Sequence, residues 1–98
     1  MGKRDLGLSG KVVVVTGGSR GLGKAIAVAM AEEGARVAIC GRKQENLDQA
    51  AEDFREKGLE VMTWAAHVAK SEEVTALFQE VEARFGTLDV LVNNVGMN

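Results

Sequence analysis

The stretch VVVVTGGSRGLGKA, Val12–Ala25, joins four consecutive valines to a glycine-rich turn. An unbroken β-branched run of this length favours a strand that is buried on both faces, as in a parallel sheet. A glycine-rich turn that leads from such a strand into an amphipathic helix is typical of phosphate-binding loops, in which the phosphate meets the helix N-terminus. The stretch therefore predicts an α/β fold with a phosphate-binding loop.

On the C-terminal side of this stretch, short apolar runs alternate with longer amphipathic segments. The predicted strands are Val12–Thr16, Arg36–Cys40, Glu60–Ala65 and Leu88–Asn94, and the predicted helices are Leu22–Glu33, Asn46–Lys57 and Ser71–Phe85. Right-handed crossovers place these strands in one parallel sheet with the order 3-2-1-4, the first part of a Rossmann-type doubly wound fold. We expect residues 1–98 to form a single, incomplete domain of this type, with its ligand at the carboxyl ends of strands one and four.

Two nucleotide-binding motifs overlap in the glycine-rich turn. Gly18, Gly23 and Lys24 give the spacing G-x-x-x-x-G-K of a P-loop, which needs a Ser or Thr next to bind Mg²⁺. That position is Ala25, and no later apolar strand ends in the Asp that a P-loop enzyme uses for the same metal. The spacing T-G-x-x-x-G-x-G, from Thr16 to Gly23, instead favours a dinucleotide whose pyrophosphate lies at the helix N-terminus. We predict no metal site.

Together with NNVG, Asn93 to Gly96, this turn resembles the short-chain dehydrogenase/reductase family. The turn has the family's T-G-x-x-x-G-x-G spacing, and NNVG is similar to the N-N-A-G that follows the fourth strand, with Val95 in place of the small Ala. The resemblance covers the whole chain, which is similar to the N-terminal half of the family's fold. It implies an NAD(P)-dependent oxidoreductase that transfers hydride between the nicotinamide and a carbonyl or alcohol.

The end of the second predicted strand favours NADP(H) over NAD(H). An NAD-selective site has an acid there to hydrogen-bond the ribose, whereas this chain has Gly41 followed by Arg42 and Lys43. A guanidinium pairs well with a 2′-phosphate, and Arg20 is a second cation within reach of the same place. Lys43 is equally consistent with a solvated turn.

His67-Val68 replaces the Asp-Val pair that family members commonly place beside the adenine. The run HVAK and the segment RKQENLDQA are similar to the NADP-dependent carbonyl reductases of the family. The residues assigned to the cofactor are Thr16, Gly17, Ser19, Arg20, Gly21, Leu22, Gly23, Arg42, His67, Val68, Asn94, Val95 and Gly96.

No catalytic residue is assigned. Family catalysis uses a Tyr and a Lys four residues after it, and this chain contains no tyrosine. We therefore expect the 98-residue chain to bind cofactor without turnover, and to use a carbonyl or alcohol substrate only together with a C-terminal half. A non-catalytic dinucleotide-binding or edge-strand interaction module is the alternative. The fourth strand, as an open apolar edge, predicts marginal stability or self-association.

Composition excludes several other classes. The formal net charge of −2 and 27% charged residues indicate neither a nucleic-acid nor a membrane partner. No apolar run is long enough for a signal peptide or a membrane span, so a cytoplasmic location is expected. Cys40 is the single cysteine and is predicted to be a small core residue rather than a nucleophile.

Overall fold

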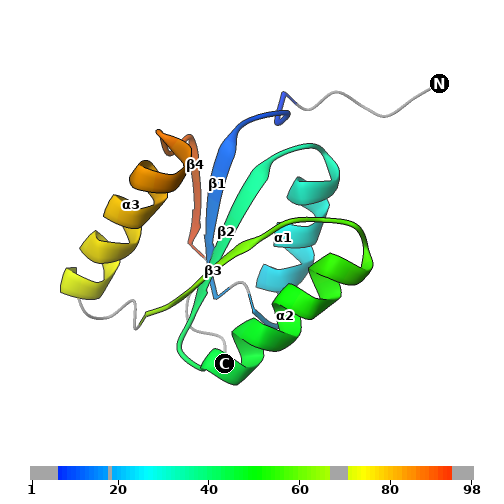
Figure 1. Ribbon diagram of the computed structural model, residues 1–98, viewed down its shortest axis with the longest axis horizontal. Helices are drawn as coiled ribbons and strands as arrows, with labels where there is room; N and C mark the ends of the chain where they lie inside the picture. The colour runs from blue at the N-terminus through cyan, green and yellow to red at the C-terminus, as the bar shows by residue number, and fades with distance from the viewer. Residues whose placement is uncertain (1–6, 18, 67–70, 94–98) are drawn as a thin grey trace.

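In a computed structural model of the chain, which describes residues 7–17, 19–66 and 71–93, strands and helices alternate around one parallel sheet (Figure 1). The elements are β1 (Val12–Thr16), α1 (Gly21–Glu32), β2 (Arg36–Gly41), α2 (Gln44–Glu56), β3 (Met62–Ala65), α3 (Ser71–Phe85) and β4 (Val90–Asn93). The predicted element order is confirmed.

The sheet has the order β3-β2-β1-β4, with every neighbouring pair parallel. Strand β1 is central, because Thr16 at its carboxyl end is paired with Cys40 of β2 on one side and Asn93 of β4 on the other. This arrangement confirms the predicted 3-2-1-4 topology of a doubly wound sheet. The chain reverses its direction of strand addition between β1 and β4, which is where such sheets bind ligands.

The valines of β1 contribute alternately to two apolar layers. Val13 and Val15 pack with residues of α1 and α2, whereas Val12 and Val14 pack with residues of α3. Figure 1 shows α1 and α2 on one side of the sheet and α3 on the other. Because both faces are covered, all five residues of β1 are buried, as the valine run predicts.

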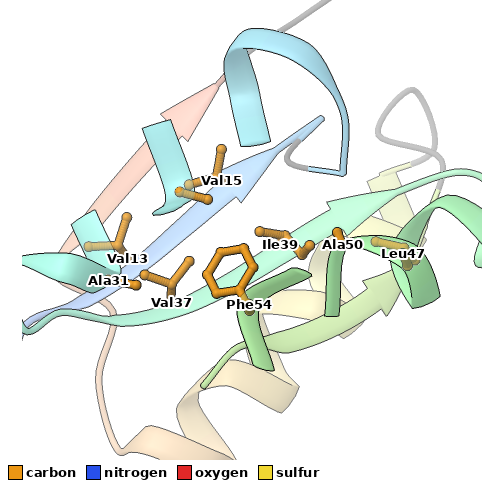
Figure 2. Packing of buried hydrophobic residues seen from close by; sticks show 9 residues of the cluster. Val13, Val15, Ala31, Val37, Ile39, Leu47, Ala50 and Phe54 are labelled. Carbon is orange, nitrogen blue, oxygen red and sulfur yellow. The ribbon is translucent and has the colours of Figure 1, made fainter. Parts of the chain in front are cut away.

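Helix α2 buries an apolar stripe against the sheet. Leu47, Ala50 and Phe54 lie on one face of this helix, at the spacing of three and four residues that a buried helical stripe requires, and each is fully buried. Figure 2 shows the Phe54 ring over β2, between Val37 and Ile39. The packing of this ring holds α2 on the sheet.

Two helices begin earlier than the sequence pattern suggests. Helix α1 starts at Gly21 rather than Leu22, and α2 starts at Gln44 rather than Asn46. The side chain of Gln44 donates a hydrogen bond to Asp48 Oδ1 at 2.8 Å, one helical turn later. The first turn of α2 is polar and α1 begins at a glycine, so neither start has the apolar spacing on which the prediction rests.

Asp89 fixes the start of the β1–β4 pair. Its carboxylate oxygen Oδ2 accepts a hydrogen bond from the Val12 N–H at 2.9 Å, and its own N–H donates to the Val12 carbonyl at 2.9 Å. Asp89 therefore satisfies both backbone groups of Val12 and sets the register in which β4 reaches Asn93.

Strand β4 is the least covered strand. Within residues 7–17, 19–66 and 71–93 it pairs with β1 alone, and Leu91 is 47% exposed. An exposed leucine on an edge strand is a contact surface for other strands. Self-association through this edge stays a prediction.

Candidate functional site

The loop between β1 and α1 turns sharply at two glycines. Gly17 has a φ of 66° and Gly21 a φ of 55°, both in the left-handed region that side chains disfavour. The Gly17 N–H donates to the Cys40 carbonyl at 2.8 Å, which joins the beginning of the loop to β2. The path of the loop out of the central strand is therefore set by these glycine conformations and by the Gly17–Cys40 hydrogen bond.

Helix α1 begins at this loop without a capping side chain. Arg20, at the N-cap, has an extended backbone and makes no side-chain hydrogen bond to the helix, and the first turn contains no acidic residue. The first peptide N–H groups of a helix lack intrahelical acceptors and carry partial positive charge. An anionic group such as a phosphate satisfies both needs, so this helix end suits the pyrophosphate of a dinucleotide.

The next two residues of α1 differ in exposure, as a cofactor-binding helix start requires. Gly23 is buried against the sheet, which allows the helix to approach closely, whereas Leu22 is 69% exposed. A leucine this exposed beside an anion-accepting helix end offers an apolar contact to a ligand that lies over the loop. The assignment of Leu22 and Gly23 to the cofactor stays a prediction.

A hydrogen bond connects the carboxyl ends of the two strands that flank the ligand edge. The Thr16 hydroxyl donates to Asn93 Oδ1 at 2.9 Å, and Thr16 is only 7% exposed. The first residue of the glycine motif is thereby tied to the first asparagine of NNVG. We infer that this hydrogen bond aligns the two predicted cofactor segments.

The carboxyl end of β2 brings Gly41 against Ser19. A Cβ atom at residue 41 would lie 3.0 Å from Ser19 Oγ and 3.4 Å from Leu47 Cδ2. A carboxylate side chain, which an NAD-selective site usually has here, would therefore require Ser19 to shift by a few tenths of an ångström. The serine hydroxyl instead lies beside the position at which the ribose is expected, and the exposed Arg42 follows directly in the chain.

Lys24, the lysine of the P-loop spacing, is engaged elsewhere. Its ammonium group forms an ion pair and hydrogen bond with Asp53 of α2, and both side chains are about three-quarters buried. A P-loop lysine must reach the β- and γ-phosphates. Here it joins α1 to α2, a structural role that the sequence reading did not identify.

The Lys24 hydrogen bond, followed by one from Gln49, lowers the pKa of Asp53. A carboxyl group whose pKa is lowered in the folded state stabilises the fold at pH values above its ordinary pKa of 3.8. This stabilisation is lost as the pH falls through the pKa of the folded state. Asp53→Asn should therefore lower the urea midpoint at pH 7 but make little difference at about pH 2.

The matched control for this titration is Asp48→Asn. Asp48 also accepts a hydrogen bond from a glutamine on α2, but no cation is paired with it in the described part of the chain. Its urea midpoint should track that of the unmodified chain at both pH values. A difference for Asp53→Asn that persists unchanged at the acid end would refute the ion-pair assignment.

Cys40 is buried at the end of β2. Burial, with a smaller effect from the Glu73 carboxylate, raises the pKa of its thiol to about 11. A thiol with this pKa is protonated at neutral pH and is a poor nucleophile. Cys40 is therefore a core residue, as predicted.

Five predicted cofactor residues lie outside the described residues: His67, Val68, Asn94, Val95 and Gly96. Their assignments stay predictions. The described candidates Thr16, Gly17, Ser19, Arg20, Gly21, Leu22, Gly23 and Arg42 all lie in the β1–α1 loop, at its flanks or at the end of β2. Asn93, which accepts the Thr16 hydrogen bond, lies beside these candidates and was not assigned to the cofactor. The parallel pairing of the first and fourth strands was the signal that could have placed it beside Thr16.

Comparison with known proteins agrees with this geometry. Residues 11–98 match the profile of the short chain dehydrogenases, which covers most of the chain. The chain belongs to the short-chain dehydrogenase/reductase family. The resemblance read from the two motifs is thereby confirmed, and the P-loop alternative is wrong.

Members of the short-chain dehydrogenase/reductase family with known names or structures match over nearly all of this chain. The 3-oxoacyl-acyl-carrier-protein reductase FabG of Staphylococcus aureus is 45% identical over 89 residues, 89% of this chain and 36% of FabG. The L-sorbose reductase of Gluconobacter frateurii, solved with NADPH and L-sorbose, is 44% identical with a TM-score of 0.89, over 96% of this chain and 36% of the reductase. A metagenomic short-chain oxidoreductase solved with NADP is 41% identical with a TM-score of 0.85, over 92% and 41% of the two chains.

The chain thus spans little more than a third of the length of these relatives. It corresponds to the N-terminal part of the short-chain dehydrogenase/reductase fold, which carries the glycine motif. In the described part of the chain, no helix combines the length and apolar character needed to cross a bilayer.

Proposed function

We propose that this chain is the NADP(H)-binding portion of a short-chain reductase. The observation that carries the proposal is the position of the Ser19 hydroxyl, which lies 3.0 Å from the place of a Cβ at Gly41, where an NAD-selective site has an acid. Arg42 and Arg20 add two exposed cations close to this place in the chain. A 2′-phosphate gains charge-assisted hydrogen bonds there, whereas the neutral 2′-hydroxyl of NAD(H) gains no charge pairing.

The remaining cofactor residues fit the same orientation. The pyrophosphate lies at the uncapped start of α1, and Gly21 allows its close approach. Leu22 covers the cofactor from the solvent side, and the Thr16 hydroxyl holds Asn93 at the carboxyl end of β4. His67, Val68, Asn94, Val95 and Gly96 belong to the adenine and ribose contacts in this proposal.

In a longer protein of the family, the bound nicotinamide would exchange hydride with a carbonyl or alcohol substrate. Two relatives are named as reductases, of a 3-oxoacyl group on acyl carrier protein and of L-sorbose. The role of the residues in this chain is to bind and orient the cofactor at the carboxyl edge of the sheet. We place the protein in the cytoplasm, with a dinucleotide rather than a nucleic acid or a membrane as its partner.

A non-catalytic dinucleotide-binding module is the second candidate, because the chain contains no tyrosine. NADPH oxidation by the 98-residue chain with a panel of ketones measures turnover, which is a separate question from cofactor binding. We expect binding of NADPH without steady oxidation above background. Sustained turnover would contradict the assignment of this chain as a binding portion.

Arg42→Ala should weaken NADPH binding by about 10- to 100-fold, because hydrogen bonds to charged groups contribute about 1.5–3 kcal/mol. NADH lacks the 2′-phosphate, so its affinity should change by less than about threefold. Titration of each cofactor by calorimetry gives both numbers.

Arg55→Ala is the matched control, because it removes the same charge from the opposite end of α2. Its guanidinium is paired with Glu52 at 2.9 Å and is far more exposed than buried. Both cofactors should bind this variant as they bind the unmodified chain. Equal losses of NADPH and NADH in Arg42→Ala would remove Arg42 from the 2′-phosphate site.

A further inference from the structure

A concave site lies at the amino end of the sheet, opposite the carboxyl edge at which we propose the dinucleotide. It is a cavity of about 320 Å³ between the start of β2, the loop from α2 to β3 and the end of α3. A volume near 300 Å³ is at the lower limit of small-molecule sites. The length of β2 separates it from Gly41 by roughly 17 Å, so the two sites do not overlap.

The lining of this cavity combines apolar surface with two guanidinium groups. Leu59, Met62 and Phe85 supply apolar surface, and Arg36 and Arg84 supply positive charge. Met62 and Phe85 belong to the layer under α3, whereas Leu59 packs on the layer under α2, so the cavity opens where the two layers meet at the end of the sheet.

Arg36 is the residue that gives the cavity a chemical preference. Its guanidinium carbon lies 5.4 Å from the centroid of the Phe85 ring, a cation–π distance that orients the group. Among the described residues no carboxylate is paired with it. A guanidinium that is oriented by a ring and lacks a counter-charge is well suited to donate two hydrogen bonds to a planar or tetrahedral anion.

Arg84 is held only loosely. Its Nε atom lies 3.8 Å from Glu80 Oε2, beyond hydrogen-bond distance, and more than half of its side chain is exposed. It is therefore available as a second donor. Glu60 also lines the cavity and disfavours an anion, so the lining holds two cations and one carboxylate, with Glu80 near Arg84 outside it.

We propose that this cavity binds a small organic anion with an apolar ring or short chain. The anionic group pairs with Arg36 and Arg84, and the apolar part contacts Phe85, Leu59 and Met62. This site does not overlap the proposed dinucleotide site, so its test is independent of the proposed function.

The test uses ¹⁵N-labelled protein with a dispersed amide spectrum and four probes: phenyl phosphate, benzoate, inorganic phosphate and benzyl alcohol. Phenyl phosphate and benzoate should shift the amides of Gly58 to Val61 and of Arg36 in a saturable manner. Inorganic phosphate lacks the ring and benzyl alcohol lacks the charge, so each should bind there at least about fivefold more weakly. Shifts confined to residues 17–23 would mean that the anions use only the start of α1, and would overturn the proposal.

Charge-removing variants then test which side chains of the cavity bind the anionic group. Arg36→Gln should weaken phenyl phosphate binding about tenfold, Arg84→Gln should weaken it less, and Glu60→Gln should tighten it. Arg42→Gln, at the other end of β2, is the control and should leave the shifts at Gly58 to Val61 unchanged. Unchanged binding in both Arg36→Gln and Arg84→Gln, or equal binding of benzyl alcohol, would refute an anion site.

Discussion

Replacing Gly21 by Val is expected to weaken NADPH binding by at least about 100-fold, or roughly 2.7 kcal/mol. Gly21 is the first residue of α1, and its φ of 55° is disfavoured for a β-branched side chain. The space around its missing Cβ is open, with no described protein atom within 4 Å. In the proposed complex that space belongs to the pyrophosphate, so the valine side chain excludes the ligand rather than disturbing the protein core.

Gly86→Val is the control that isolates this effect. Gly86 follows α3, has a φ of 86°, and likewise has no described protein atom within 4 Å of a Cβ. Both variants carry a similar backbone strain of about 1–3 kcal/mol, which a urea melt measures. Only Gly21→Val should lose the cofactor in a fluorescence titration with NADPH. Parallel losses of binding in the two variants would attribute the effect to strain and would contradict the assignment of Gly21.

Phe54→Ala is expected to lower the free energy of unfolding by about 3–5 kcal/mol, the cost of removing a buried aromatic side chain and leaving a cavity. The Phe54 ring is fully buried over β2, and the described chain has no larger buried side chain. Small domains are stable by only about 5–15 kcal/mol, so this single change should remove a large part of the free energy of unfolding. Urea denaturation followed by circular dichroism measures the loss.

Two further variants serve as comparisons for Phe54→Ala. Phe54→Leu keeps most of the apolar volume and should cost clearly less than Phe54→Ala. Leu22→Ala removes a side chain that is already 69% exposed, so the free energy of unfolding should change by less than about 0.5 kcal/mol. A loss below about 1 kcal/mol for Phe54→Ala would show that α2 is not held on the sheet by this ring.

The fold could be predicted from the sequence because its main signals are local. The valine run of β1 and the stripe of Leu47, Ala50 and Phe54 each determine the type of one element and the face that is buried. The strand order then follows from the handedness of crossovers, with no knowledge of contacts. The starts of α1 and α2 were misplaced because their first turns are governed by polar groups and glycine rather than by apolar spacing.

The site could be predicted less completely, because several of its contacts join residues that are distant in the chain. The Thr16–Asn93 hydrogen bond depends on the register of β1 against β4, which Asp89 sets. The Lys24–Asp53 pair depends on how α1 lies against α2. Sequence spacing identifies which residues belong to the loop, but only packing shows that Lys24 is turned to α2 and that Ser19 lies against Gly41.

Calorimetric titration of the folded 98-residue chain with NADPH, NADH and Mg²⁺-ATP tests the central claim most directly. The account predicts one NADPH site, with NADH bound at least about tenfold more weakly and Mg²⁺-ATP more weakly than NADPH. Absence of NADPH binding by folded protein, or tighter binding of Mg²⁺-ATP than of NADPH, would contradict it.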